Sequence, residues 1–130
     1  MAVEHESANY RPCVVLAHAD SAHAADVARR LRQLGWDVYR ADDGSAARRL
    51  AQMLAPEVVL LDADLIQESG WLTCAKLTHE RPTSKVVLVG DTTERNRNLA
   101  DFVGACALVR RDESLAAILA HTAPPTAAAG

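Results

Sequence analysis

Residues 57–64 read EVVLLDAD, in which the apolar run 58–61 is followed directly by Asp62. An unbroken apolar run rich in β-branched residues is typical of a strand buried on both faces of a parallel sheet. Pro56, just before this stretch, ends the preceding helical pattern. The stretch therefore predicts a central strand with an acidic residue at its carboxyl end.

Runs of the same kind lie on both sides of this strand. They are CVVLA (13–17), the shorter WDVYR (36–40), KVVLV (85–89) and CALV (106–109). The segments between and after them have helical apolar spacing, at 21–34, 41–54, 71–80, 92–105 and 112–122. This spacing directs several large apolar side chains toward the core, among them Leu34, Leu99, Phe102 and Leu119.

Strict alternation of strands and helices fixes the fold class. Crossovers of this length join parallel strands with a right-handed connection, and the helices then cover both faces of the sheet. The sequence predicts an α/β fold, a three-layer α/β/α sandwich on a five-stranded parallel sheet. A length of 130 residues suits one domain, expected at 12–122, with an amino-terminal extension at 1–11 and a flexible tail at 123–130.

Composition excludes some classes of partner and location. The formal net charge is -3, whereas nucleic-acid binding usually needs a basic excess. No stretch approaches the ~20 apolar residues of a membrane-spanning helix, and residues 1–12 do not form a secretory signal. The chain is therefore expected in the cytoplasm, without a nucleic-acid or membrane partner.

Four motifs, in this order and spacing, carry a resemblance to a known family. ADDG occupies residues 41–44, VVLLD ends at Asp62, Gly70 follows eight residues later, and Gly104-Ala105 precedes the last strand. Over residues 12–120 the chain resembles the receiver domains of response regulators in two-component signalling, or phosphorelays. The resemblance implies a flavodoxin-like fold with strand order 2-1-3-4-5 and places Asp62 at the carboxyl end of the central strand.

The resemblance also implies which residues occupy the family's reactive positions. Asp62 stands where the family has its phosphoacceptor. The acidic pair that holds Mg²⁺ in the family falls on His18 and Ala19, neither of which offers a carboxylate. The family's switch hydroxyl falls on Gly90, which has none. Binding of Mg²⁺ is therefore expected to be weak or absent.

The position of the family's lysine falls on Arg110 or Arg111. Either arginine, or else His18, is expected to contact the Asp62 carboxylate, because a part-buried anion needs a partner. A histidinium at residue 18 would have a raised pKa, whereas a neutral, hydrogen-bonded histidine is the simpler interpretation. His23, five residues on, is not expected to form a metal pair with His18.

Two further acidic residues lie near these positions. Asp20 is interpreted as a helix N-cap, and Asp64 as a solvated loop residue. The alternative is that Asp20, Asp62 and Asp64 together hold Mg²⁺.

These observations leave three functional hypotheses. The first is an atypical receiver, or pseudo-receiver, that works by protein–protein interaction without Mg²⁺-dependent phosphorylation and needs no cofactor. The second is a response regulator phosphorylated on Asp62 by a histidine kinase, with Mg²⁺ as cofactor. The third is a small enzyme or cofactor binder; against an enzyme, no glycine-rich phosphate loop follows the first strand and no nucleophile–base arrangement stands out.

The expected partner is a protein or a histidine kinase. In the family, partners and dimer mates use the face of the fourth helix, fifth strand and fifth helix, here 92–105, 106–109 and 112–122. Arg95 and Arg97 lie at the start of the first of these segments, so they are candidates for partner binding or for a homodimer contact.

Overall fold

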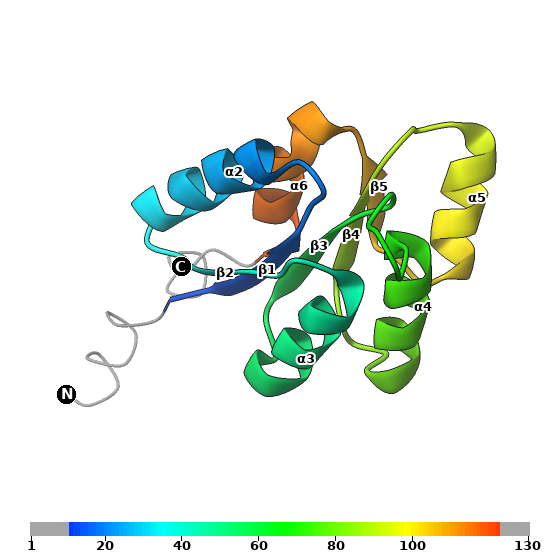
Figure 1. Cartoon of the computed structure of the whole chain (residues 1–130), viewed down its shortest axis with the longest axis horizontal. Coiled ribbons are helices and arrows are strands. Elements are labelled where there is room, and N and C mark those ends of the chain that lie inside the picture. The colour runs from blue at the N-terminus through cyan, green and yellow to red at the C-terminus, as the bar shows by residue number, and fades with distance from the viewer. Residues whose placement is uncertain (1–10, 123–130) are drawn as a thin grey trace, which may run out of the picture.

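A computed structural model describes residues 11–122 (Figure 1). The strands are β1 (Cys13–Ala17), β2 (Asp37–Arg40), β3 (Val58–Asp62), β4 (Val86–Val89) and β5 (Ala107–Val109). The helices are α2 (Ser21–Gln33), α3 (Gly44–Leu54), α4 (Gly70–Glu80), α5 (Glu94–Phe102) and α6 (Ser114–Ala120), with a short 3₁₀ helix, η1 (Arg111–Glu113), before α6. The expected tail at 123–130, and all of the expected extension except Arg11, lie outside the described residues.

The five strands form one parallel sheet in the order β2-β1-β3-β4-β5. This arrangement confirms the predicted fold and strand order. The central strand is β3, all five of its residues are buried, and Asp62 is the last of them. Its carboxylate therefore lies at the edge of the sheet where the carboxyl ends of the parallel strands meet.

Each face of the sheet carries its own apolar core. Helices α2 and α6 cover one face, while α3, α4 and α5 lie on the other (Figure 1). Alternate side chains of β1 show the division: Val14 and Leu16 pack toward α2, and Val15 and Ala17 toward α3. All four are at most 1% exposed, so the strand is anchored from both sides.

Four helices begin at a side-chain cap at the carboxyl edge of the sheet. Asp20 accepts a hydrogen bond from the backbone N–H of the residue three positions on, and the caps of α3, α4 and α5 do the same. Those three caps are Asp43, Ser69 and Thr93. Such a cap stabilises a helix by ~1 kcal/mol, so the caps determine where each loop at this edge turns into a helix.

Four of the large apolar side chains expected in the core are exposed instead. Phe102 is 87% exposed and Leu34 is 58% exposed, while Leu99 and Leu119 are 37% and 38% exposed. Helix α2 ends at Gln33, so Leu34 lies at its C-cap, and Gly35, with a φ of +90°, turns the chain directly after it. In α5, Ala100 and Val103 take the inward positions and leave Phe102 outside.

At the free edge of the sheet, an outward backbone carbonyl of β2 is hydrogen-bonded by the side chain of Arg32. The backbone N–H groups of Asp37 and Ala41 donate to β1 and its flanking residue Pro12, so the backbone groups of Val38 face away from β1. The guanidinium of Arg32 in α2 donates to the carbonyl oxygen of Val38 at 2.9 Å.

Of the helices in residues 11–122, none is long and apolar enough to cross a membrane.

Candidate functional site at the carboxyl edge of the sheet

Asp62 is a buried carboxylate held by two backbone donors. The N–H of Ala19, after β1, donates to Oδ2 at 2.9 Å, and the N–H of Asp64 donates to Oδ1 at 3.0 Å. The residue is only 7% exposed. Because each oxygen already accepts a hydrogen bond from a backbone group, the carboxylate is fixed in one orientation between the ends of β1 and β3.

Helix α4 begins directly against the backbone of Asp62. A Cβ on Gly70 would lie 2.7 Å from the carbonyl carbon of Asp62 and 2.8 Å from Cα of Ala63, and would overlap the carbonyl oxygen of Asp62 more closely still. The N–H of Gly70 donates to the carbonyl oxygen of Ala63 at 3.1 Å. Because Gly70 has no side chain, the loop can return to the end of β3 without a steric clash.

The loop between Asp62 and Gly70 is fastened by Glu68. Its carboxylate accepts hydrogen bonds from Arg48 at 3.1 Å, from Thr73 at 2.7 Å and from Lys76 at 2.7 Å. Burial raises the pKa of Glu68, but these three donors outweigh it and hold the pKa at about 2. No motif in the sequence indicates this network, which connects α3, the loop and α4.

Of the three residues expected beside Asp62, His18 is the one that contacts its carboxylate. Its Nδ1 lies 3.3 Å from Oδ2 of Asp62, and the imidazole side chain is 3% exposed. The same Nδ1 accepts the backbone N–H of Asp20 at 3.0 Å. With Nδ1 as the acceptor of this hydrogen bond, the ring is assigned as neutral with its proton on Nε2.

The electrostatic surroundings of His18 agree with a neutral ring. Burial lowers the pKa of His18; the negative charge of Asp62 opposes this effect, and the proximity of His23 and Arg111 adds to it. The alternative of a histidinium with a raised pKa is therefore wrong. Nε2 is fully buried and has no hydrogen-bond partner within residues 11–122.

The first turn of α2 brings a second histidine to this place. The ring centroids of His18 and His23 are 4.8 Å apart, and Nε2 of His23 lies 3.2 Å from Oγ of Ser114 in α6. No metal pair was expected of these two histidines, and their ring contact was not predicted. The contact arises because α2 begins at Ser21, four residues after β1 ends at Ala17.

The two arginines of the lysine position do not reach Asp62. Arg111 donates to Oδ2 of Asp20 at 2.9 Å, and Arg110 pairs with Asp112 and Glu113 next to it in sequence. Both side chains are more than half exposed. The 3₁₀ helix η1 starts at Arg111 and turns these side chains toward α2 and toward solvent.

The interpretation of Asp20 as an N-cap is confirmed. Oδ1 of Asp20 accepts the N–H of His23 at 3.1 Å, and Oδ2 holds Arg111. Asp64 is exposed, as expected, and it contacts the Asp62 carboxylate through its backbone N–H rather than through its own carboxylate. Gly90 directly follows β4 and lies next to Ala63, where an added Cβ would be 3.2 Å from the Ala63 methyl group.

The donor groups at this edge do not fit Mg²⁺, which prefers several oxygen ligands. The residues at the family's acidic pair supply an imidazole and a methyl group, and the Asp20 carboxylate is engaged by α2 and Arg111. Across residues 11–122, no group of three or more acidic, histidine or cysteine side chains is arranged to hold a metal ion. The alternative set of Asp20, Asp62 and Asp64 is therefore not assembled.

The neutral state of His18 can be measured by following its ring resonances in an NMR titration. The midpoint is expected below the ordinary histidine value. Asp62→Asn should lower the midpoint further, because it removes the negative charge that favours protonation, and His23→Gln should raise it. A midpoint above the ordinary value in the wild-type chain would contradict the assignment of a neutral ring.

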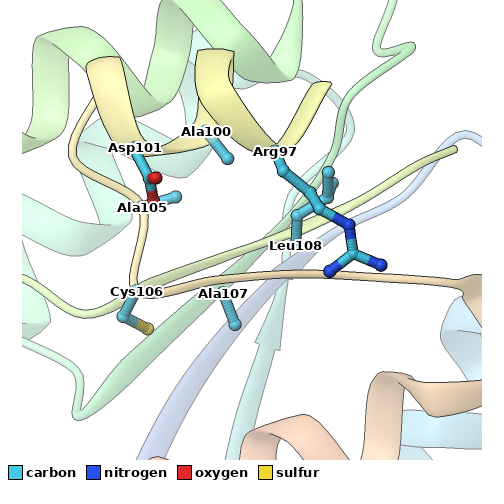
Figure 2. Close-up of a pocket in the computed structure, with 7 residues that line it drawn as sticks. All are labelled: Arg97, Ala100, Asp101, Ala105, Cys106, Ala107 and Leu108. Atoms are coloured by element: carbon cyan, nitrogen blue, oxygen red, sulfur yellow. The ribbon is translucent and has the colours of Figure 1, made fainter. Parts of the chain in front are cut away.

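The candidate residues for partner binding lie away from Asp62, on α5. Arg95 and Arg97 are both exposed. Nε of Arg97 donates to the carbonyl oxygen of Thr92 at 3.2 Å. Figure 2 shows Arg97 reaching from α5 toward β5 above Leu108, with Asp101 at the other end of the same hollow.

In fold and in sequence, the chain is similar to response regulators. The chemotaxis protein CheY4 of Vibrio cholerae superposes with a TM-score of 0.78 at 16% identity, covering 87% of this chain and all of that one. The signal receiver domain of the response regulator NarL of Mycobacterium tuberculosis superposes with a TM-score of 0.74 at 25% identity, covering 85% of this chain and 94% of that domain.

In sequence, the chain is 37% identical over 83 residues to the transcriptional regulatory protein TcrX of Mycobacterium tuberculosis, covering 63% of this chain and 36% of that protein. The chain spans about a third of the length of the curated relatives that it matches. No protein-family model matches it. Strand order, the buried aspartate at the end of β3 and these similarities together identify the chain as a member of the response-regulator receiver domain family of two-component signalling.

Proposed function

We propose that this receiver domain is an atypical one, which transmits its signal through protein–protein contacts in the cytoplasm without Mg²⁺-dependent phosphorylation of Asp62. Its partner is a histidine kinase or another signalling protein. Asp62 keeps the phosphoacceptor position, while His18 and Ala19 replace the acidic pair, Gly90 replaces the hydroxyl residue, and arginine replaces the lysine.

The observation that carries the proposal is the set of groups that contact the Asp62 carboxylate. Phosphoryl transfer to a carboxylate brings two anions together, and the charge must be neutralised for the reaction to proceed. Here the carboxylate faces the imidazole of His18 and two backbone N–H groups, and within residues 11–122 no group of acidic, histidine or cysteine side chains is arranged to hold a metal ion beside it. The two N–H groups stabilise the unmodified aspartate, whereas an unprotonated Nδ1 offers the carboxylate no donor, and none of these groups provides the charge that the transfer requires.

Incubation with a small acyl phosphate and Mg²⁺, read by intact mass spectrometry, tests this proposal. The wild-type chain is expected to keep its mass, as is the Asp62→Asn control. A phosphoryl adduct on the wild-type chain that disappears in Asp62→Asn would refute the proposal and establish a phosphoaccepting receiver.

A variant with the acidic pair restored makes the same experiment sharper. His18→Asp/Ala19→Asp supplies two carboxylates beside Asp62, so it is expected to bind Mg²⁺ and to be stabilised by it. The wild-type chain should show no saturable Mg²⁺ site below ~10 mM by calorimetry or by the fluorescence of Trp36 and Trp71. A wild-type site in the sub-millimolar range would contradict the assignment.

A further inference from the structure

A small cavity lies between the carboxyl ends of β1 and β2. Its volume is about 170 Å³, and its walls are the residues after β1, the first turn of α2, the end of β2 and the loop after β3. All of these segments lie at the carboxyl edge of the sheet (Figure 1). Pockets for drug-sized ligands begin at ~300 Å³, whereas at ~30 Å³ for each water molecule this cavity has room for about six non-hydrogen atoms. It therefore suits a very small ligand.

Two opposite charges line this cavity. Arg40 ends β2, and Asp42 follows two residues later. Neither side chain forms an ion pair within the described part of the chain. Nη2 of Arg40 donates to the carbonyl oxygen and to the hydroxyl of Ser21 at 3.2 and 3.0 Å. Because that hydroxyl accepts a hydrogen bond, its own proton is available to an anion beside the guanidinium.

A buried hydrogen-bond donor also lines the cavity. The imidazole of His18 is 3% exposed, and its Nε2 is the buried side-chain nitrogen that has no hydrogen-bond partner within residues 11–122. Because Nδ1 accepts the N–H of Asp20, Nε2 carries the proton and can only donate. A buried donor without an acceptor is unfavourable, so an acceptor atom bound against this wall would stabilise the ring in place.

The remaining wall is largely apolar. Ala24, Ala41 and Leu65 line the cavity and are each at most 9% exposed. The cavity thus offers a cation, an anion, two neutral donors and a small apolar surface. An α-amino acid with a small side chain carries the complementary groups, which are a carboxylate, an ammonium and a few carbon atoms.

We propose that this cavity binds a small α-amino acid. Its carboxylate accepts hydrogen bonds from Arg40, Ser21 and Nε2 of His18. Its ammonium group donates to Asp42, and its side chain packs against Leu65. The inference rests on the proposed function of a receiver that works without phosphorylation, and the amino acid supplies the input. One bound molecule contacts the segments after β1, β2 and β3 together.

The balance of charge favours a zwitterion over a simple anion. An anion bound to Arg40 would face the carboxylate of Asp42 in the same cavity, and Oδ2 of Asp62 lies 3.3 Å from Nδ1 of His18. Like charges at such short range repel one another strongly where little water screens them. A zwitterion brings no net charge and places its cation beside Asp42. A phosphate, with its higher charge, fits this cavity least.

An NMR titration of the full, ¹⁵N-labelled chain tests the proposal. Glycine, L-alanine and L-serine are added one at a time, from ~0.1 to ~10 mM. At least one of them is expected to saturate the chain and to shift the backbone amides of Ala19, Ser21 and Leu65. The Nε2–H resonance of His18 should move with them, because it gains an acceptor. Failure of all three amino acids to saturate these resonances would overturn the proposal.

Fragments of alanine test whether both charged groups are recognised. Propionate lacks the ammonium and ethylamine lacks the carboxylate, so each should bind at least tenfold more weakly than the best of the three amino acids. L-tryptophan should not bind, because its side chain exceeds the volume of the cavity. Propionate or L-tryptophan binding as tightly as the best small amino acid would contradict the proposal.

Two variants that each remove one charge assign the contacts. Arg40→Gln and Asp42→Asn are each expected to weaken binding roughly tenfold or more, because each removes a charge-assisted hydrogen bond. Arg49→Gln and Asp101→Asn are the matched controls, since both residues are exposed and lie outside the cavity, and they should leave binding unchanged. Equal effects of a variant and its control would overturn the assignment.

This inference and the proposed function fail in different experiments. A phosphoryl adduct on Asp62 would refute the proposed function and remove the need for another input. An absence of amino-acid binding, with the wild-type mass unchanged by the acyl phosphate, would refute the inference alone.

Discussion

Gly70→Ala is expected to destabilise the fold by ~3 kcal/mol or more, at the upper end of what a single added methyl group does. The new Cβ would fall on the backbone of Asp62 and Ala63, and backbone atoms cannot swing aside as a side chain can. Relief of the overlap requires α4 to move away from the end of β3. Urea unfolding followed by tryptophan fluorescence measures the loss.

Gly35→Ala is the matched control for this substitution. Gly35 has a φ of +90°, so alanine is strained there, but its Cβ would have no neighbour within 4 Å. A loss of ~1 kcal/mol is expected from the backbone conformation alone. Equal losses at the two glycines would mean that α4 can shift without cost, against the close contact at Asp62.

Glu68→Gln is expected to reduce stability at neutral pH by ~2 kcal/mol. A folded-state pKa of about 2, against an ordinary 4.5, corresponds to at most ~3 kcal/mol, and solvent screening of part-exposed Lys76 reduces this figure. The variant also leaves Arg48 and Lys76 facing a neutral amide instead of a carboxylate.

The pH dependence of stability identifies the carboxylate as the source of this effect. Because the pKa of Glu68 is lowered on folding, its contribution is complete above 4.5 and is lost as the pH falls from 4.5 toward 2. Urea unfolding at pH 6 and at pH 3 should show the difference between the wild-type chain and Glu68→Gln shrinking at the lower pH. Glu94→Gln, on the exposed first turn of α5, serves as control; an equal response from both variants would contradict the assignment.

The strands and their parallel pairing follow from local sequence to a large degree, whereas their order was implied by the family resemblance. A run such as 58–61 has no polar residue to place in solvent, so only a strand buried on both faces accommodates it, and crossover length then dictates parallel pairing. Asp62 ends such a run, so its place at the carboxyl edge was predictable. The N-cap role of Asp20 was predictable for a similar reason, because a cap acts on backbone only three residues away.

Helix ends and side-chain exposure were less predictable. The spacing of Leu34 and Phe102 fits an inward face, but both lie at helix ends, where the backbone leaves the helical path. Whether a terminal apolar residue is buried depends on what packs beyond the helix. Nothing in residues 11–122 covers Phe102, and no local pattern indicates that.

The partners within the site depend on tertiary packing, which sequence spacing does not report. Arg111 reaches Asp20 across 91 residues because α2 and η1 lie side by side at one edge. His18 and His23 are five residues apart in sequence, and their rings meet because α2 begins close to the end of β1. The loss of the acidic pair was visible in the sequence, whereas the destination of each remaining charge was not.

The hydrogen bond from Arg32 to Val38 bears on aggregation. The outer strands of an open sheet present unpaired backbone groups, and other chains can add to them and extend the sheet. At β2 the outward carbonyl of Val38 is already bound by a guanidinium from the neighbouring helix. An invading strand would have to displace a charge-assisted bond and bring its own backbone past a cation before it could pair. Helix α2, which covers one face of the sheet, thus also disfavours the addition of a further strand at the β2 edge.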